Sequence, residues 1–391
     1  MTARWRRIEP TDEVTIDGVL VVHDPGTMTL HALNSGAALL WHLLDRPTAP
    51  GALLGFVADA TGRPAPELAT EVEAGLDALV AAGLATDRPA VEPVDDTSPP
   101  VRPSIAHSAE PLRPGHTRLG PFALLDERAT IDLPGEHPAH DVLDRLLHGL
   151  VDAAGDTGDR PDPAILRYGL EPVDDTSLVR VEVDGRLLCA DGPLDAQLTY
   201  LLWHLNHAAV EGSRQPLLLH AGAVAGPSGT IALAGAPGAG KSTLTAALVR
   251  SGLGYVTDEA LAIDPAGGVT AYAKPLSLDE SSLGLLHLAP GEARAGHVSP
   301  DVVGPTSVVP PPLRAVILPD RTRALDPADL DRPLAASDAL LALGACAFGL
   351  ARRRQVGLDA LAALSRRIPV LRLGTSDLDA ATQALHRLLL R

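Results

Sequence analysis

The sequence predicts an α/β protein that begins with a small, winged-helix-like α+β module. Alternating apolar and polar residues flank Asp17-Gly18, a two-residue hairpin signal, and three helical patterns follow. A stretch rich in Pro, Asp and Ser then interrupts the chain at residues 86–104. Beyond it strand and helix patterns alternate, and one apolar strand leads into "GAPGAGKST" (Gly235–Thr243) and a helix.

The composition favours a soluble protein and narrows its partners. A chain of 391 residues, 46% hydrophobic and 21% charged, is long enough for two or three domains. A net charge of −17 argues against nucleic acid and against an anionic membrane surface, because both require a basic face. We expect the basic run Arg352–Arg354 to be a solvated helix face.

The sequence also predicts a cytoplasmic location. The start, "MTARWRRIEPTDEV", lacks the apolar core of a signal peptide. The longest apolar run, residues 340–351, is too short to span a bilayer. Cys189 and Cys346 lie far apart, and we expect both to be buried small hydrophobes in a reducing compartment.

The N-terminal module is expected to cover residues 1–86. After the Asp17-Gly18 hairpin, "MTLHALN" is a third strand, and Asn34 is the N-cap of a helix that buries Leu40, Trp41 and Leu44. A second helix covers residues 51–62. The third helix ends at Gly83 and carries an apolar stripe made of Leu68, Val72, Leu76, Leu79 and Val80.

Residues 87–110 are expected to be a linker, and residues 111–391 an α/β domain. Hairpins are predicted at Asp184-Gly185 and between Pro227 and Ser228, with a helix over residues 195–212 between them. The second turn sets a register in which His220 lies opposite Gly235. The chain closes with a strand and a helix over residues 368–391.

The glycine-rich stretch fits G-x-x-x-x-G-K-[ST] at every position, between a strand and a helix. Backbone N–H groups of such a loop surround phosphates, and the helix N-terminus adds positive potential. We expect Lys241 to reach the β- and γ-phosphates of ATP and Ser242 to bind Mg²⁺. A glycine-rich turn without a ligand is the alternative. The expected nucleotide contacts are Gly235, Ala236, Pro237, Gly238, Ala239, Gly240, Lys241, Ser242 and Thr243.

A second group of candidates follows the loop helix. Asp258 comes 17 residues after Lys241, which leaves room for a helix and a strand; at the carboxyl end of a parallel strand it would face the phosphates. One of Asp258 and Glu259 could take a substrate proton while the other holds metal, or both could lie in a solvated turn. His220 could be a core histidine or could orient a carboxylate or a phosphate oxygen. Lys274 is expected at the end of another strand, where it could bind phosphate or the substrate backbone, or could be a surface lysine.

The residues from Leu218 to Leu278 resemble the HPr serine kinase/phosphorylase family in "LLHAGAV", "GAPGAGKSTL", "LGYVTDEALAI" and "AYAKPLSL". The resemblance implies a P-loop kinase domain of HPr kinase type that forms homo-oligomers. It also implies that Asp258 is the acid/base, that His220 assists it, and that Glu259 occupies the metal-binding position. The chain lacks the E-x-R-G stretch of HPr-directed enzymes. It is more similar to divergent kinases of ribosomal-peptide biosynthesis, including lasso peptides.

Residues 12–86 resemble a PqqD-like peptide-recognition element in "VVHDPGTMTLHALNSGAALLWHLLD" and "LDALVAAGLA". Such modules bind a leader peptide as an added strand, in a groove beside the third helix. The two resemblances together imply an ATP- and Mg²⁺-dependent Ser/Thr kinase of a ribosomally synthesised precursor peptide. The alternatives are an ATPase switch that phosphorylates no substrate, a binding module without turnover, and a small-molecule kinase.

Overall fold

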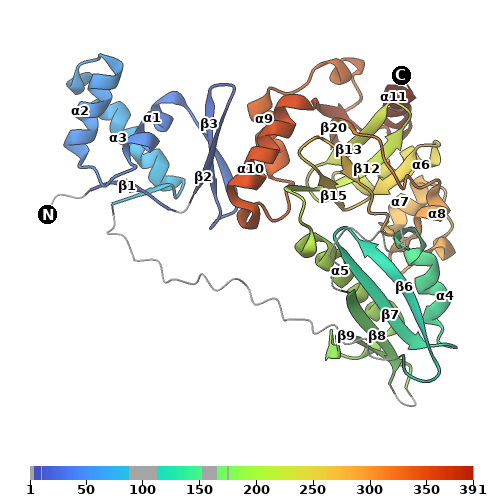
Figure 1. Ribbon diagram of the computed structural model, residues 1–391. Helices are drawn as coiled ribbons and strands as arrows, with labels where there is room; N and C mark the ends of the chain where they lie inside the picture. Colours follow the sequence, from blue (N-terminus) through green and yellow to red (C-terminus); the bar gives the residue numbers. More distant parts are fainter. Residues whose placement is uncertain (1–3, 10, 88–111, 152–164, 174–175, 391) are drawn as a thin grey trace. The chain divides into compact units, whose positions relative to one another are not determined.

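The computed structural model describes residues 4–9, 11–87, 112–151, 165–173 and 176–390, which divide into two compact units (Figure 1). The first unit combines the N-terminal residues up to 87 with Ala335–Ala345 and Leu350–Ser365. The second unit holds the other described residues. Apart from Asp87, the expected linker lies outside the described residues, and the predicted domain limits stay predictions.

The first unit is built on an antiparallel sheet in the order β2-β3-β4. As predicted, Asp17 (φ 51°) and Gly18 (φ 79°) form the first turn in the left-handed conformation, and the side chain of Asn34 accepts the Ala37 N–H at 2.9 Å. Its N-terminal elements are β1 (Arg6–Arg7), β2 (Asp12–Ile16), β3 (Val19–Asp24), β4 (Thr29–Leu33), α1 (Ser35–Leu43), α2 (Pro50–Thr61), α3 (Ala65–Ala81) and β5 (Ala85–Thr86).

Helix α1 packs on β3 and β4, and α2 and α3 pack on α1, so that the sheet and the three helices share one apolar core. Leu20 and Val22 of β3 pack with Trp41 and with the predicted stripe of α3, which is buried from Leu68 to Leu79. The prediction was wrong for Val80, which is 40% exposed. Its side chain lies on a different side of α3 from the buried side chains of Leu68, Val72 and Leu79. This module is therefore a small α+β domain.

Two late helices, α9 (Ala336–Gly344) and α10 (Leu350–Arg367), belong to the same unit, and α9 packs on β4. Arg354 was expected to be solvated, but its Nε lies 3.1 Å from Oδ2 of the buried Asp12, which also lies 3.2 Å from Nδ1 of the buried His23. A buried carboxylate requires such partners. The sequence pattern of α10 alone could not indicate that Arg354 would be one of them. The N-terminal sheet is thus anchored to residues more than 300 positions later in the chain.

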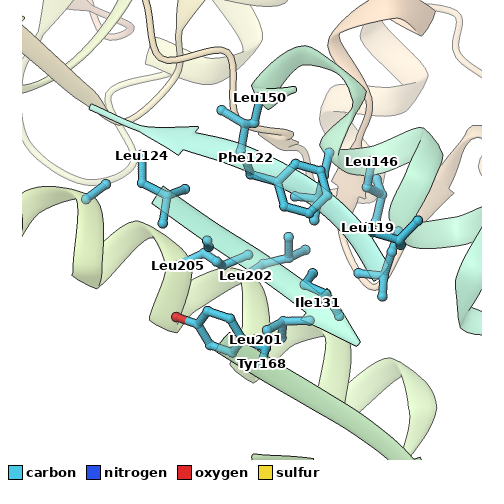
Figure 2. Close-up of a cluster of buried hydrophobic side chains, with 14 of the residues drawn as sticks. Leu119, Phe122, Leu124, Ile131, Leu146, Leu150, Tyr168, Leu201, Leu202 and Leu205 are labelled. Carbon is cyan, nitrogen blue, oxygen red and sulfur yellow. The ribbon is translucent and has the colours of Figure 1, made fainter. Parts of the chain in front are cut away.

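The second unit contains two main sheets. The first, β10-β9-β8-β7-β6 with β11 beside β9, is formed by β6 (His116–Leu124), β7 (Glu127–Pro134), β8 (Ile165–Pro172), β9 (Leu178–Val183), β10 (Arg186–Leu187) and β11 (Gly192–Pro193). Helices α4 (Ala139–Leu147) and α5 (Leu194–Gly212) pack against it, and Figure 2 shows their leucines facing Phe122, Ile131 and Tyr168. The same core reaches Leu218 and Ala260 of the second sheet.

The second sheet runs β16-β15-β12-β13-β20-β21, with β14 also paired to β12. Its strands are β12 (Leu217–Gly226), β13 (Gly229–Ala234), β14 (Gly254–Thr257), β15 (Ala260–Ile263), β16 (Val269–Thr270), β20 (Leu313–Asp320) and β21 (Val370–Gly374). Helices α6 (Lys241–Arg250) and α11 (Leu378–Leu390) pack on it. A small sheet is formed by β17 (Leu276–Ser277), β19 (His297–Val298) and β18 (Ala293–Arg294), in that order. In the chain, α7 (Glu280–Leu285) follows β17 and α8 (Pro300–Val303) follows β19.

Several expectations about this unit can be compared with the structure. Ala221 pairs with Ala234, which is the predicted register of the β12–β13 hairpin, and Asp184-Gly185 forms the predicted turn. The strand after α6 was expected to be a parallel neighbour of the loop strand. β14 does run in the same direction as β13, but it is not its neighbour, because β12 lies between them and is antiparallel to both. Cys346 is buried as expected, whereas Cys189 is partly exposed and donates to Gln197. Within the described residues, no helix has the length and apolar character needed to cross a membrane.

Candidate functional site

The glycine-rich loop connects β13 to α6 at the middle of the second sheet. Gly238 (φ 79°) and Gly240 (φ 86°) adopt the left-handed conformation, which a residue with a Cβ disfavours. A Cβ at Gly240 would also lie 2.9 Å from Cδ of Arg321. Since the first N–H groups of a helix lack partners within it, the start of α6 directs its N–H groups at this loop. The loop and helix together make an anion-binding geometry.

Lys241 is the first residue of α6 and is only 6% exposed. Its Nζ donates to the carbonyl oxygens of Gly235 at 2.8 Å and Ala236 at 3.2 Å. Burial lowers the pKa of this ammonium group. Cys346 lies beside it, where burial raises the pKa of the thiol and the Gly235 backbone hydrogen bonds to it. Nothing in the sequence pattern indicated that Cys346 would reach this loop.

Asp258 lies between β14 and β15, at the register position opposite Gly222 of β12. It is 3% exposed, and its Oδ2 accepts the Ser277 N–H at 3.2 Å. Ser242 of α6 lies close enough to this carboxylate to lower its pKa, while Oδ1 has no hydrogen-bond partner among the described residues. Burial raises the pKa of Asp258 to about 6. As the sequence-based prediction placed it, Asp258 directly follows the carboxyl end of a strand that runs in the same direction as β13, although β12 separates the two strands.

Glu259 points away from Asp258, because successive residues of an extended chain face opposite sides. Its Oε1 lies 3.6 Å from Nε2 of His220, and its Oε2 lies 3.7 Å from Nζ of Lys274. The His220 ring stacks on Phe348 at 5.3 Å. Burial lowers the pKa of His220, and Glu259 opposes that shift only in part. The four predicted residues His220, Lys241, Asp258 and Glu259 are thus grouped around one end of β12.

Lys274 was expected at the end of a strand, but it lies in an irregular segment before β17 and is only 7% exposed. Its Nζ donates to the Pro275 carbonyl at 3.0 Å, and its own carbonyl accepts the hydroxyl of the buried Tyr255 at 2.7 Å. Of the 32 Lys and Arg residues in the chain, only Lys241 and Lys274 are lysines. An ammonium group and a guanidinium group are not interchangeable at a specific site. The presence of lysine at these two positions, in a chain that otherwise uses arginine, could therefore have indicated that both residues have a specific role.

Three arginines on or just after β20 differ in their surroundings. Arg314 approaches the Ser228 carbonyl and Arg323 pairs with Asp329 at 3.0 Å, both away from the loop. Arg321 follows β20, the parallel neighbour of β13; its side chain packs on Gly240, and its Nη1 is 3.4 Å from the Gly238 carbonyl. Position alone therefore singles out Arg321 as the cation that could face an anion in the loop.

These residues fit a nucleotide with Mg²⁺. The loop offers N–H groups and Lys241 for phosphate, and the unpartnered Oδ1 of Asp258 beside Ser242 is an oxygen that a polar ligand could satisfy. In the part of the chain that the structure describes, no group of three or more His, Cys, Asp or Glu residues could hold a metal. A Mg²⁺ here would take most of its oxygen ligands from phosphate and water, as Mg²⁺ commonly does.

Comparison with known proteins finds one family model that matches part of the chain. Residues 20–85 match the family model described as coenzyme PQQ synthesis protein D (PqqD). No curated protein matches the chain. The matched range runs from β3 to β5. It includes two of the three strands of the β2-β3-β4 sheet and all of α1, α2 and α3, but not β2. Residues 20–85 are therefore a PqqD-like domain, carried by a mixed α/β chain.

Proposed function

We propose that the chain is an ATP-dependent kinase that phosphorylates a Ser or Thr hydroxyl of a ribosomally synthesised precursor peptide. One observation carries most of the weight: a buried carboxylate with a pKa of about 6 and an unpartnered Oδ1 lies close to Ser242, at the start of the loop helix. Such a carboxylate is poised to accept a proton near neutral pH. The resemblance to HPr kinase and the P-loop motif supports the same proposal.

In the proposed reaction, Lys241 exchanges its two loop carbonyls for phosphate oxygens and holds the nucleotide. Asp258 takes the proton of the acceptor hydroxyl; a bond forms from that oxygen to the γ-phosphorus, and the bond from phosphorus to the ADP oxygen breaks. Mg²⁺, when bound beside Ser242, supplies charge neutralisation for the phosphates. Lys274 and Arg321 flank the loop and offset the remaining negative charge.

In this proposal the PqqD-like domain binds the leader of the precursor peptide by strand addition. The structure favours β4 as the receiving strand. At the other edge, the side chain of Gln355 accepts the Glu13 N–H at 3.2 Å and donates to the Glu13 carbonyl at 2.9 Å, so it occupies the backbone groups that a peptide would need on β2. Among the described residues, β4 pairs only with β3.

Leader binding should protect the backbone amides of β4 from hydrogen exchange. The measurement is exchange followed by mass spectrometry on the full chain, with and without the synthetic leader segment of the precursor peptide encoded beside the gene. Peptides covering residues 29–33 should exchange more slowly when the leader is present, because an added strand accepts their N–H groups. The segment around Glu13 is the internal control. Protection there, with none at residues 29–33, would contradict the assignment of β4.

The proposed activity is tested by the intact mass of that precursor peptide after incubation with the full chain, ATP and Mg²⁺. A gain of one phosphoryl group supports the kinase. ATP hydrolysis without a gain in mass would instead support an ATPase switch. Deleting residues 1–86 is a poor control, because it uncovers the faces of α9 and α10 that pack on the sheet. A precursor without its leader is the better one, and it should be phosphorylated far more slowly.

A further inference from the structure

A cavity of about 210 Å³ opens beside the proposed catalytic carboxylate, entirely within the second unit. One wall is apolar and comes from α5 and the segment after α4, where Leu150, Leu202 and Trp203 line it. The opposite end is polar and contains Glu259 and Lys274. The cavity therefore has an apolar side and a charged end, which is typical of a site that orients a ligand.

The polar end of the cavity adjoins Asp258. Ser277, which lines the cavity, donates its backbone N–H to Oδ2 of Asp258 at 3.2 Å, and Glu259 is the next residue in the chain. Asp258 itself is not one of the lining residues, so a molecule seated in the cavity would be separated from this carboxylate by the backbone of Ser277. The glycine-rich loop reaches the same carboxylate through Ser242. Asp258 thus lies between the place proposed for the nucleotide and this cavity.

Two features indicate that the cavity receives a ligand. Asn206 and Tyr272 line it, and among the described residues the buried Oδ1 of the first and hydroxyl of the second lack hydrogen-bond partners. A buried polar atom without a hydrogen-bond partner destabilises the protein, so a ligand that supplied one would be favoured there. Trp203 lines the cavity and is nevertheless 61% exposed, with its ring stacked on His207 at 5.4 Å. An exposed tryptophan at the edge of a cavity is a frequent anchor for a bound peptide.

We propose that this cavity binds the residue adjoining the phosphoryl acceptor in the precursor peptide, and that it selects a bulky uncharged side chain. This inference rests on the proposed kinase function. The leucines and Trp203 exclude a charged side chain, because nothing on that wall would replace its lost hydration. The polar end has groups that can hydrogen bond to the peptide backbone there. The cavity therefore specifies the sequence next to the acceptor, whereas the PqqD-like domain selects the leader.

The test compares Trp203→Ala with Tyr200→Ala in the full chain. Tyr200 is 53% exposed on the same helix, one turn away, and does not line the cavity, so the two changes have similar effects on folding. With the precursor peptide encoded beside the gene, Trp203→Ala should raise the peptide KM about tenfold or more, with kcat and the KM for ATP within about twofold. Tyr200→Ala should behave as wild type.

Peptide variants complete the test. In the precursor, the residues before and after the acceptor are each replaced by Asp and by Ala. Wild type should lose at least about tenfold in kcat/KM with one of the Asp peptides, and Trp203→Ala should lose much less with the same peptide. If wild type phosphorylates the precursor but the Trp203 and Tyr200 variants behave alike, the cavity proposal is overturned and the kinase stands. If wild type phosphorylates no peptide, both proposals fail.

Discussion

Replacing Asp258 with asparagine is expected to lower phosphoryl transfer by about 10²–10⁴-fold, because the amide cannot take the acceptor proton. ATP affinity should change little, since Lys241 and the loop backbone hold the phosphates. Transfer is measured by peptide mass and ATP affinity by calorimetry. The matched control is Asp264→Asn, a carboxylate six residues later that caps the turn at Ala266 and Gly268. Full transfer by the Asp258 variant would exclude Asp258 as the base.

The raised pKa of Asp258 gives this prediction a pH signature. Because the base acts when deprotonated, kcat/KM of the wild type should rise with pH through about 6 and then level off, and Asp258→Asn should lose that rise. The free energy of unfolding changes in the opposite direction: it falls with rising pH where kcat/KM rises. A carboxyl group whose pKa is higher folded than unfolded lowers the free energy of unfolding as pH rises from about 4 to 6.

Asparagine carries no charge, so Asp258→Asn removes the free-energy cost of burying the ionised carboxylate. Asp258→Asn should therefore be more stable than wild type at pH 8, by up to about 3 kcal/mol for a shift from 3.8 to about 6. Chemical denaturation of both proteins at pH 8 measures the difference. A variant that is inactive and also more stable has lost chemistry, whereas an inactive and less stable one has lost its fold.

Replacing Lys241 with methionine should weaken ATP binding by about 10²-fold, because the loop loses charge-assisted hydrogen bonds to phosphate. Methionine fills a similar volume, so the buried position stays packed. Lys241→Arg should not restore binding, since the larger guanidinium cannot occupy the space between the Gly235 and Ala236 carbonyls. The dissociation constant for Mg²⁺-ATP is measured by calorimetry.

The matched control for Lys241 is Arg323→Met. Arg323 lies two residues after Arg321, beyond the carboxyl end of β20, but its guanidinium pairs with Asp329 and not with the loop. Removing it also deletes one positive charge, so it reports the effect of net charge on ATP binding. Its dissociation constant should stay within about twofold of wild type. Equal losses in the two variants would mean that Lys241 contributes only through long-range charge.

The local signals in the sequence proved reliable where structure follows from a few neighbouring residues. The positive φ angles at Asp17 and Gly18, the Asn34 cap and the β12–β13 register were all confirmed, because turn geometry and strand alternation act over only a few residues. The grouping of His220, Asp258 and Glu259 near Lys241 also followed from spacing along adjacent elements. The roles of these residues in catalysis stay predictions.

Contacts between distant segments could not be predicted in the same way. The pairing of β14 with β12 instead of β13 depends on the sheet order, and the choice of Arg321 over Arg314 depends on β20 running parallel to β13, which puts its carboxyl end beside the loop. Lys274 is buried only because Tyr255 and the cavity residues surround it. Each of these outcomes depends on packing between elements far apart in the chain, on which local propensity carries no information.

The sequence by itself determined the PqqD-like domain, the glycine-rich loop and the residues that face it, because these rest on short-range patterns and fixed spacings. Only the tertiary structure decided that α9 and α10 complete the N-terminal unit, and that a cavity adjoins Asp258. The physical reason is burial. The second face of the β2-β3-β4 sheet and the charge of Asp12 need partners, and the nearest suitable surface lies on helices some 320 residues away in sequence.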